Sequence, residues 1–138
     1  MTITAAADES EPVFNREIKL APDGAAVCQA RDFVRAGLLA LGLADERIED
    51  GVLIASELVT NAIEAAPDSP FLVIVRDDDD APVIEVHDCS AGLPRVRQND
   101  LFSERGRGLP IVTALCREWK CVPCEGGKAI VAKLHRRL

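Results

Sequence analysis

The sequence predicts an α+β fold, a two-layer α/β sandwich in which helices cover one face of a mixed, mostly antiparallel sheet. Segments of strand-like composition occur in two pairs, 71–76 with 82–88 and 119–124 with 128–134, each pair joined by a short turn signal. The helical segments do not alternate regularly with these strands, as they would in a doubly wound parallel sheet. A chain of 138 residues is long enough for one core and too short for two comfortable ones. We therefore expect one domain over 13–138.

The first elements are predicted by alternation and by breaker residues. Residues 1–12 are polar and are expected to form a disordered tail. The next segment, FNREIKL (14–20), alternates apolar and polar residues as a half-buried strand does. Apolar residues then recur at helical spacing over 25–41, and Gly42 follows as a C-terminal stop.

Two further helices are predicted by their ends. The second helix should cover 45–66, with Asp45 as N-cap and Pro67 unable to continue it. A third, shorter helix is expected at 108–118, because Pro110 is tolerated in the first turn of a helix.

Composition and termini exclude several function classes. A net charge of −7 argues against a protein that binds nucleic acid directly, since such proteins normally present a broad basic face. The N-terminus lacks the basic and apolar regions of a signal peptide, and no apolar run approaches the length of a membrane span. The five cysteines are odd in number and too sparse for a disulfide scaffold. A cytoplasmic protein with reduced thiols is expected.

Two groups of residues suggest a metal only weakly. The acidic run at 77–80 is best interpreted as a solvated hairpin turn between two strands. A zinc site could be considered at Cys116, Cys121, Cys124 and His135. This set includes only one CxxC motif, and the fourth ligand would be distant from it. Neither group is the favoured site.

The segment SELVTNA (56–62) places Glu57 and Asn61 four residues apart, so both side chains share one helix face at the border of the apolar stripe. An amide oxygen suits Mg²⁺, and a nearby carboxylate could orient or deprotonate a nucleophile. The alternative is that both residues simply face water, which is common for a lone Glu-x-x-x-Asn on a helix.

The segment DCSAG (88–92) places Asp88 at the end of an apolar strand, followed by small residues ending in Gly92. An ionised carboxylate only accepts hydrogen bonds, so it complements the exocyclic amino group of adenine. The alternative is that Asp88 only initiates a turn.

The stretch RVRQNDLFSERGRGLPIV (95–112) concentrates arginines and places Gly106 and Gly108 directly before a predicted helix. Glycines allow close approach of a ligand to the backbone, and a helix N-terminus offers unpaired N–H groups. These features predict a phosphate site, with a flexible solvated loop as the alternative. Neither the P-loop nor the dinucleotide fingerprint is complete here.

Taken in order, these three segments resemble the boxes of the histidine-kinase-like ATPase superfamily, which includes histidine kinases, gyrases and the heat-shock chaperone and shares the Bergerat fold. SELVTNA is similar to its N box, DCSAG to its first glycine box and GRGLPIV to its second. Within that superfamily the chain most resembles anti-sigma-factor serine/threonine kinases and small actinobacterial ATP-binding regulators. The resemblance covers roughly residues 14–134.

The resemblance implies a site for ATP and Mg²⁺. It makes Asn61 the Mg²⁺ ligand, Glu57 the general base and Asp88 the reader of adenine, with Gly92 forming the turn beneath the base. The phosphates would be covered by a lid made of Arg105, Gly106, Arg107, Gly108 and Leu109.

The resemblance also implies a function: sequestering a sigma factor and phosphorylating an anti-sigma antagonist protein, with a homodimer allowed. The chain departs from the family pattern at Ala65, where a histidine is usual, at Ser90, where glycine is frequent, and at Ala129, where a threonine is common. These departures keep a second function open, a non-kinase ATP-binding partner-switch module. A catalytic fragment of a histidine kinase is the third reading.

Overall fold

The structure is a computed structural model that describes residues 14–89 and 108–137. Its helices are α2 (Ala26–Ala40), α3 (Asp45–Ala65) and α5 (Gly108–Leu115). Its strands are β1 (Asn15–Leu20), β2 (Phe71–Asp78), β3 (Ala81–Asp88), β4 (Glu118–Cys124) and β5 (Gly127–Lys133). The elements follow one another in the order that the sequence predicts.

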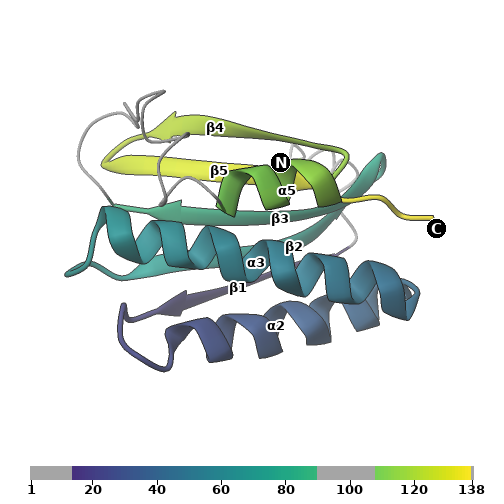
Figure 1. Cartoon of the computed structure of the whole chain (residues 1–138), viewed down its shortest axis with the longest axis horizontal. Helices are drawn as coiled ribbons and strands as arrows, with labels where there is room; N and C mark the ends of the chain where they lie inside the picture. The colour runs from purple at the N-terminus through teal and green to yellow at the C-terminus, as the bar shows by residue number, and fades with distance from the viewer. Residues whose placement is uncertain (1–13, 90–107, 138) are drawn as a thin grey trace, which may run out of the picture.

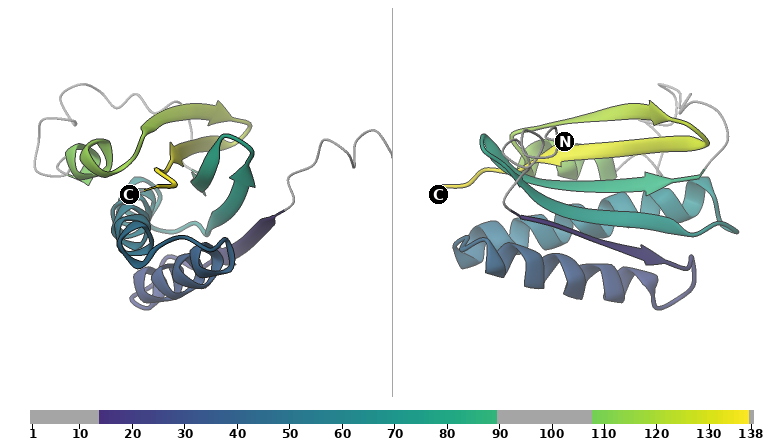
Figure 2. Two further views of the ribbon diagram at one scale, coloured as in Figure 1. Left: turned by 90° about the vertical axis from the view of Figure 1, so that its right-hand side faces the viewer. Right: turned by 180° about the vertical axis from the view of Figure 1, so that it is seen from behind.

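The strands form one five-stranded sheet in the order β1-β2-β3-β5-β4. All four pairings between these described strands are antiparallel, so the sheet contains no parallel pair within the described ranges. Figure 1 shows α2, α3 and α5 in front of the sheet, and the end-on view in Figure 2 shows them on a single side of it. The predicted two-layer α+β sandwich is therefore confirmed.

The alternation in β2 explains how the two layers are joined. Phe71, Val73 and Val75 point toward the helices and are at most 2% exposed. Leu72 and Ile74 lie on the opposite, outer face and are only half-buried. Because successive side chains of a strand point to opposite faces, one strand serves both the core and the outer surface.

Two glycines let the helices approach closely. A Cβ atom added at Gly51 of α3 would lie 2.3 Å from Cδ1 of Leu38 in α2. A Cβ added at Gly37 of α2 would lie 3.0 Å from Cγ1 of Val75 in β2. Small residues at these two points set the spacing between α2, α3 and the sheet.

The predicted stop at Gly42 is confirmed. Gly42 has φ of +79°, the left-handed conformation that glycine adopts without steric cost. Its N–H donates to the carbonyl of Leu39 at 2.9 Å, and the N–H of Leu43 donates to the carbonyl of Leu38 at 3.4 Å. This pair of bonds closes the end of α2 as a Schellman motif does.

Two predicted helix ends were wrong. The N-cap of α3 is Ala44, and Asp45 is the first helical residue, where its charge still favours the positive end of the helix dipole. Helix α5 ends at Leu115 instead of residue 118. The chain leaves the helix there because Arg117 already donates its N–H to the carbonyl of Lys133, at 2.8 Å, beside the start of β4.

The hairpin turn predicted for the acidic run is made by residues 79–80, whereas Asp77 and Asp78 form the end of β2 and pair with Pro82 and Ala81. Within the described ranges, no helix combines the length and the apolar character that a membrane crossing requires.

Candidate functional site

Several chain segments that the sequence singled out meet at one end of the molecule. The C-terminal part of α3, the end of β3, the start of α5 and the start of β5 all lie toward the left of Figure 1. Helix α3 packs against both α5 and β3. The fold thus brings the described parts of the three sequence boxes to the same end.

Glu57 and Asn61 share one face of α3, as their spacing predicts. Both side chains are half-buried, whereas the intervening Thr60 is exposed. Ile54, one turn before Glu57, is fully buried. The two polar groups therefore lie at the border of the buried stripe and not on the fully solvated side of the helix.

Asp88 is the last residue of β3 and is only 7% exposed. Its register places it on the helix side of the sheet, two residues beyond Val86. A carboxylate at a simple surface turn is normally solvated, so its burial argues against the turn-forming alternative. Burial of a charge requires a partner.

That partner is Lys128, the second residue of β5. Its Nζ lies 2.7 Å from Oδ2 of Asp88, and the two side chains are only 12% and 5% exposed. At this distance the contact is a charge-assisted hydrogen bond. Lys128 is not among the site residues that the sequence predicts.

The sheet register explains this omission and corrects the role given to Ala129. The β3–β5 ladder pairs Asp88 with Lys128 and His87 with Ala129. Adjacent residues of a strand point to opposite faces, so Ala129 lies on the outer face and Lys128 lies beside Asp88. Lys128, and not Ala129, is therefore the β5 residue next to Asp88. Counting the strand positions from the EGG turn at 125–127 would have found it.

Gly127 allows β5 to start against the end of β3. A Cβ atom at this position would lie 1.9 Å from the carbonyl oxygen of Asp88 and 2.9 Å from Cα of Cys89. Gly126, its neighbour in the turn, has φ of +82°. The two glycines therefore have different roles, because Gly126 makes the turn and Gly127 makes room for the backbone that carries Asp88.

The charges of Asp88 and Lys128 also affect the pKa of the Cys121 thiol on β4. Burial raises the pKa of this thiol, while the charge of Lys128 lowers it and that of Asp88 raises it. A raised pKa keeps the thiol neutral and weakly nucleophilic. All five cysteines of the chain are free thiols. In the parts of the chain that the structure describes, no three His, Cys, Asp or Glu side chains gather closely enough to hold a metal ion.

The predicted phosphate lid is described only at its end. Gly92, Arg105, Gly106 and Arg107 lie outside the described residues, as does Ser90. Gly108 begins α5, and Leu109 is partly buried and packs against the hydrophobic core. The sequence also predicts that the nucleotide pocket lies between α3 and the 89–108 loop, and residues 90–107 of that loop lie outside the described residues.

The outer face of the sheet carries a second polar cluster, formed by Glu85 with Arg76 and His87. Oε2 of Glu85 lies 2.6 Å from Nε of Arg76 and its Oε1 lies 2.8 Å from Nε2 of His87. The hydrogen bond from His87, together with Arg76, lowers the pKa of the Glu85 carboxyl even though burial opposes the shift.

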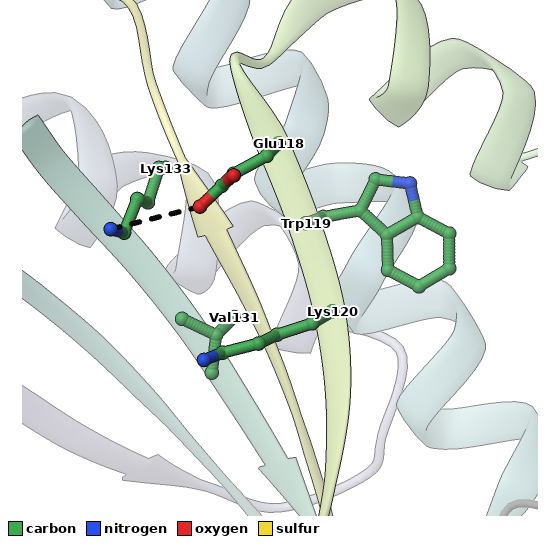
Figure 3. A pocket seen from close by; sticks show the side chains of 5 residues that line it. All are labelled: Glu118, Trp119, Lys120, Val131 and Lys133. Carbon is green, nitrogen blue, oxygen red and sulfur yellow. Dashed lines mark ion pairs between the residues drawn. The ribbon is translucent and has the colours of Figure 1, made fainter.

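This outer face also holds a small pocket at β4 and β5. Its volume is about 120 Å³. Figure 3 shows that the Trp119 ring points away from the other lining side chains and that Lys133 pairs with Glu118, at 3.7 Å. Ligand pockets usually measure about 300–1,000 Å³, so this one is too small for a nucleotide. It is lined by Glu118, Trp119, Lys120, Val131 and Lys133.

Comparison with known protein families matches residues 20–133 to the histidine kinase-like ATPase domain. A solved structure described as the RsbU and RsbW domains of Rv1364c from Mycobacterium tuberculosis matches with a TM-score of 0.63 at 22% identity. The match covers 92% of this chain and 34% of that chain, so this chain spans about a third of that structure. Comparison with curated proteins gave no match.

Proposed function

The chain belongs to the histidine kinase-like ATPase domain family, and from that premise we propose that it binds ATP with Mg²⁺ at the end of the sheet where Asp88 lies. We propose further that it transfers the terminal phosphoryl group to a serine or threonine of a regulatory partner protein. The observation that supports this most is the buried carboxylate of Asp88 at the end of β3, where α3 and α5 also converge.

Asp88 is proposed to accept a hydrogen bond from the exocyclic amino group of adenine. Its ionised carboxylate has no donor, so it discriminates against a base that presents a carbonyl oxygen at the same place. Lys128 holds this carboxylate in place through the contact of 2.7 Å between its Nζ and Oδ2 of Asp88. A buried acceptor discriminates between bases more strongly than a solvated one. A base without a donor at this point would displace water and leave the acceptor without a hydrogen bond.

Asn61 and Glu57 are proposed to act at the phosphate end. Both side chains are half-buried on one face of α3, and neither belongs to the buried core. They are therefore accessible to a ligand. Asn61 would hold Mg²⁺ through its amide oxygen, and the bound ion would neutralise charge on the phosphates. Glu57 would take the proton of the partner's hydroxyl group as the hydroxyl oxygen bonds to the γ-phosphorus of ATP, while the bond from that phosphorus to the bridging oxygen breaks and ADP leaves.

The partners are proposed from two sources. The SELVTNA, DCSAG and GRGLPIV boxes resemble those of anti-sigma-factor kinases, and the solved structure with the matching fold is described as RsbU and RsbW domains. We therefore propose a partner-switch role with a sigma factor and an antagonist protein as partners. A homodimer and a cytoplasmic location belong to the same proposal.

A non-kinase ATP-binding module is the second candidate, and Ala65 favours it. This residue stands at the exposed end of α3, where the family usually has a histidine. In β5 the residue beside Asp88 is Lys128 and not Ala129, so a lysine stands where the resemblance implies a threonine. The kinase remains the better-supported function.

The test combines binding with phosphoryl transfer. Calorimetric ATP titrations with and without Mg²⁺ should show that Asn61→Ala loses most of the Mg²⁺-dependent gain in affinity. Asn15→Ala is the matched control, because Asn15 is an exposed asparagine on β1 at the outer face. The parent should also label a candidate partner with phosphate from ATP, with the modified serine or threonine located by mass spectrometry. ATP binding without transfer to any partner would favour the second candidate.

A further inference from the structure

We propose that Lys128 is a specificity-determining residue that reads the base together with Asp88. In this proposal Asp88 accepts from the exocyclic amine of adenine while Lys128 donates to the adjacent ring nitrogen, N1. The inference rests on the proposed ATP function and assigns a role to a residue that the three sequence boxes do not contain.

The first support is position. Lys128 and Asp88 are cross-strand partners in the β3–β5 ladder, on the helix side of the sheet. Their charged atoms lie 2.7 Å apart. Any group that hydrogen-bonds to the Asp88 carboxylate therefore comes within reach of the Lys128 ammonium. An ammonium has three N–H donors, so pairing with Asp88 and donating to a ligand are compatible.

The second support is the chemistry of the base edge. Adenine presents a donor, the N6 amine, beside an acceptor, N1. The Asp88–Lys128 pair presents an acceptor beside a donor, which is the complementary order. Guanine presents the opposite order, with the O6 acceptor beside the N1–H donor. The pair therefore matches adenine at two adjacent points and opposes guanine at both.

The third support is burial. The two side chains are 5% and 12% exposed, so the pair is held in one place and its hydrogen bonds are little weakened by water. A buried ion pair is weak evidence for stability, because an apolar pair of similar size often serves the fold as well. The Asp88–Lys128 pair lies at the end of the sheet where α3, α5 and β5 meet. Its burial there is therefore better explained by a role in ligand binding than by a contribution to stability.

The alternative is that Lys128 only neutralises Asp88 and never contacts the base. The two readings differ in one measurable property, the dependence of affinity on N1. If Lys128 donates to N1, replacing N1 by C–H should weaken binding only while the lysine is present. If Lys128 is a counter-ion alone, its removal weakens all adenine nucleotides alike.

The experiment titrates ATP and 1-deaza-ATP, in which C–H replaces N1, into the parent and three variants. These are Lys128→Met, Lys133→Met and the double variant Asp88→Asn with Lys128→Met. Lys133 is the matched control, because it lies on the same strand but on the outer face, paired with Asp80. The double variant replaces both members of the buried pair and is used if the single Lys128→Met variant does not fold. Melting of the ligand-free proteins checks that each variant is folded.

The parent and Lys133→Met should bind ATP at least about tenfold more tightly than 1-deaza-ATP, as expected for loss of a charged hydrogen bond. For Lys128→Met, or for the double variant if the single one does not fold, this ratio should fall to about one. A parent that binds both nucleotides equally, or a Lys128→Met variant that keeps the parent's ratio, overturns the inference while leaving ATP binding intact. A parent that binds neither nucleotide overturns the proposed function as well.

Discussion

Strand β3 carries two acidic side chains on its opposite faces, and their surroundings differ. Asp88, at the strand's end, points toward the helices and pairs with Lys128. Glu85, three residues earlier, points outward and pairs with Arg76 and His87. Both carboxylates are charged, paired and largely buried, with side chains 5% and 13% exposed. Charge and burial alone do not separate a functional residue from a structural one.

What separates them is their place in the fold. Asp88 ends a strand where α3, α5 and β5 converge, whereas Glu85 lies in the middle of a sheet face that no described helix covers. A strand end allows a ligand to approach the carboxylate, while a mid-strand position holds it between neighbouring strands. We therefore propose a binding role for Asp88 and a stabilising role for Glu85, and the following variants separate the two roles.

The largest effect is expected on the helix side, for Glu57→Gln. The substitution keeps the shape and hydrogen-bonding reach of the side chain but removes the base. Transfer of phosphate to a partner should fall roughly 10²–10⁴-fold while ATP affinity stays nearly unchanged. Glu64→Gln, at an exposed position of the same helix, is the control. Transfer by Glu57→Gln at the parent's rate would show that Glu57 is not the base.

The second variant pair compares the two faces of β3 directly. Asp88→Asn introduces a donor opposite the amino group of adenine, so ATP affinity should fall roughly 10- to 100-fold, as for the loss of a charged hydrogen bond. Glu85→Gln, on the other face of the same strand, should leave ATP affinity unchanged. Calorimetric titration measures both, and equal affinities for Asp88→Asn and the parent would remove Asp88 from the site.

Gly127→Ala tests whether the backbone at the Asp88 end must be closely packed. The added methyl group would overlap the Asp88 carbonyl, and the resulting shift should lower the free energy of unfolding by about 1–3 kcal/mol. It should also weaken ATP binding because it moves Asp88. At Gly24 an added Cβ meets no atom within 4 Å, so Gly24→Ala is the control. Denaturant unfolding measures this change in stability. An unchanged free energy of unfolding for Gly127→Ala would contradict the close approach of residue 127 to the Asp88 carbonyl.

The smallest effect is expected from Glu85→Gln on stability. The pKa of Glu85 is lowered in the folded protein, chiefly by the hydrogen bond with His87. Its ionised form therefore stabilises the fold above the ordinary glutamate pKa, and this contribution is lost as pH falls through the lowered value. The variant should be less stable by about 1 kcal/mol near neutral pH. The difference should shrink in acid, and a constant difference across pH would argue against this origin.

The fold could be predicted from the sequence because its signals are local. Alternation in FNREIKL, the β-branched run of β2 and the glycine at position 42 each act within a few residues. The sequence does not predict a helix end that depends on a contact with a distant part of the chain. Helix α5 stops early because residue 117 pairs with Lys133, and no periodicity in 108–118 contains that information.

The residues of the candidate site stay predictions, and they differ in how local their sequence signals are. Asp88 could be identified because a carboxylate ending an apolar strand is a local pattern. Lys128 could not be identified in the same way, because its relation to Asp88 depends on the register between β3 and β5. An error of one residue, from Lys128 to Ala129, changes the face of the sheet on which the side chain lies.

We propose that MgATP binds at the helix-side end of β3 and not on the outer face. Backbone-amide NMR during a MgATP titration tests it most directly. We predict the largest shifts around Glu57 and Asn61, at Asp88 and at Gly127–Lys128, with little change at Ile74, Val131 and Lys133. Shifts concentrated on those three outer-face residues, or no shifts at saturating nucleotide, would contradict the account.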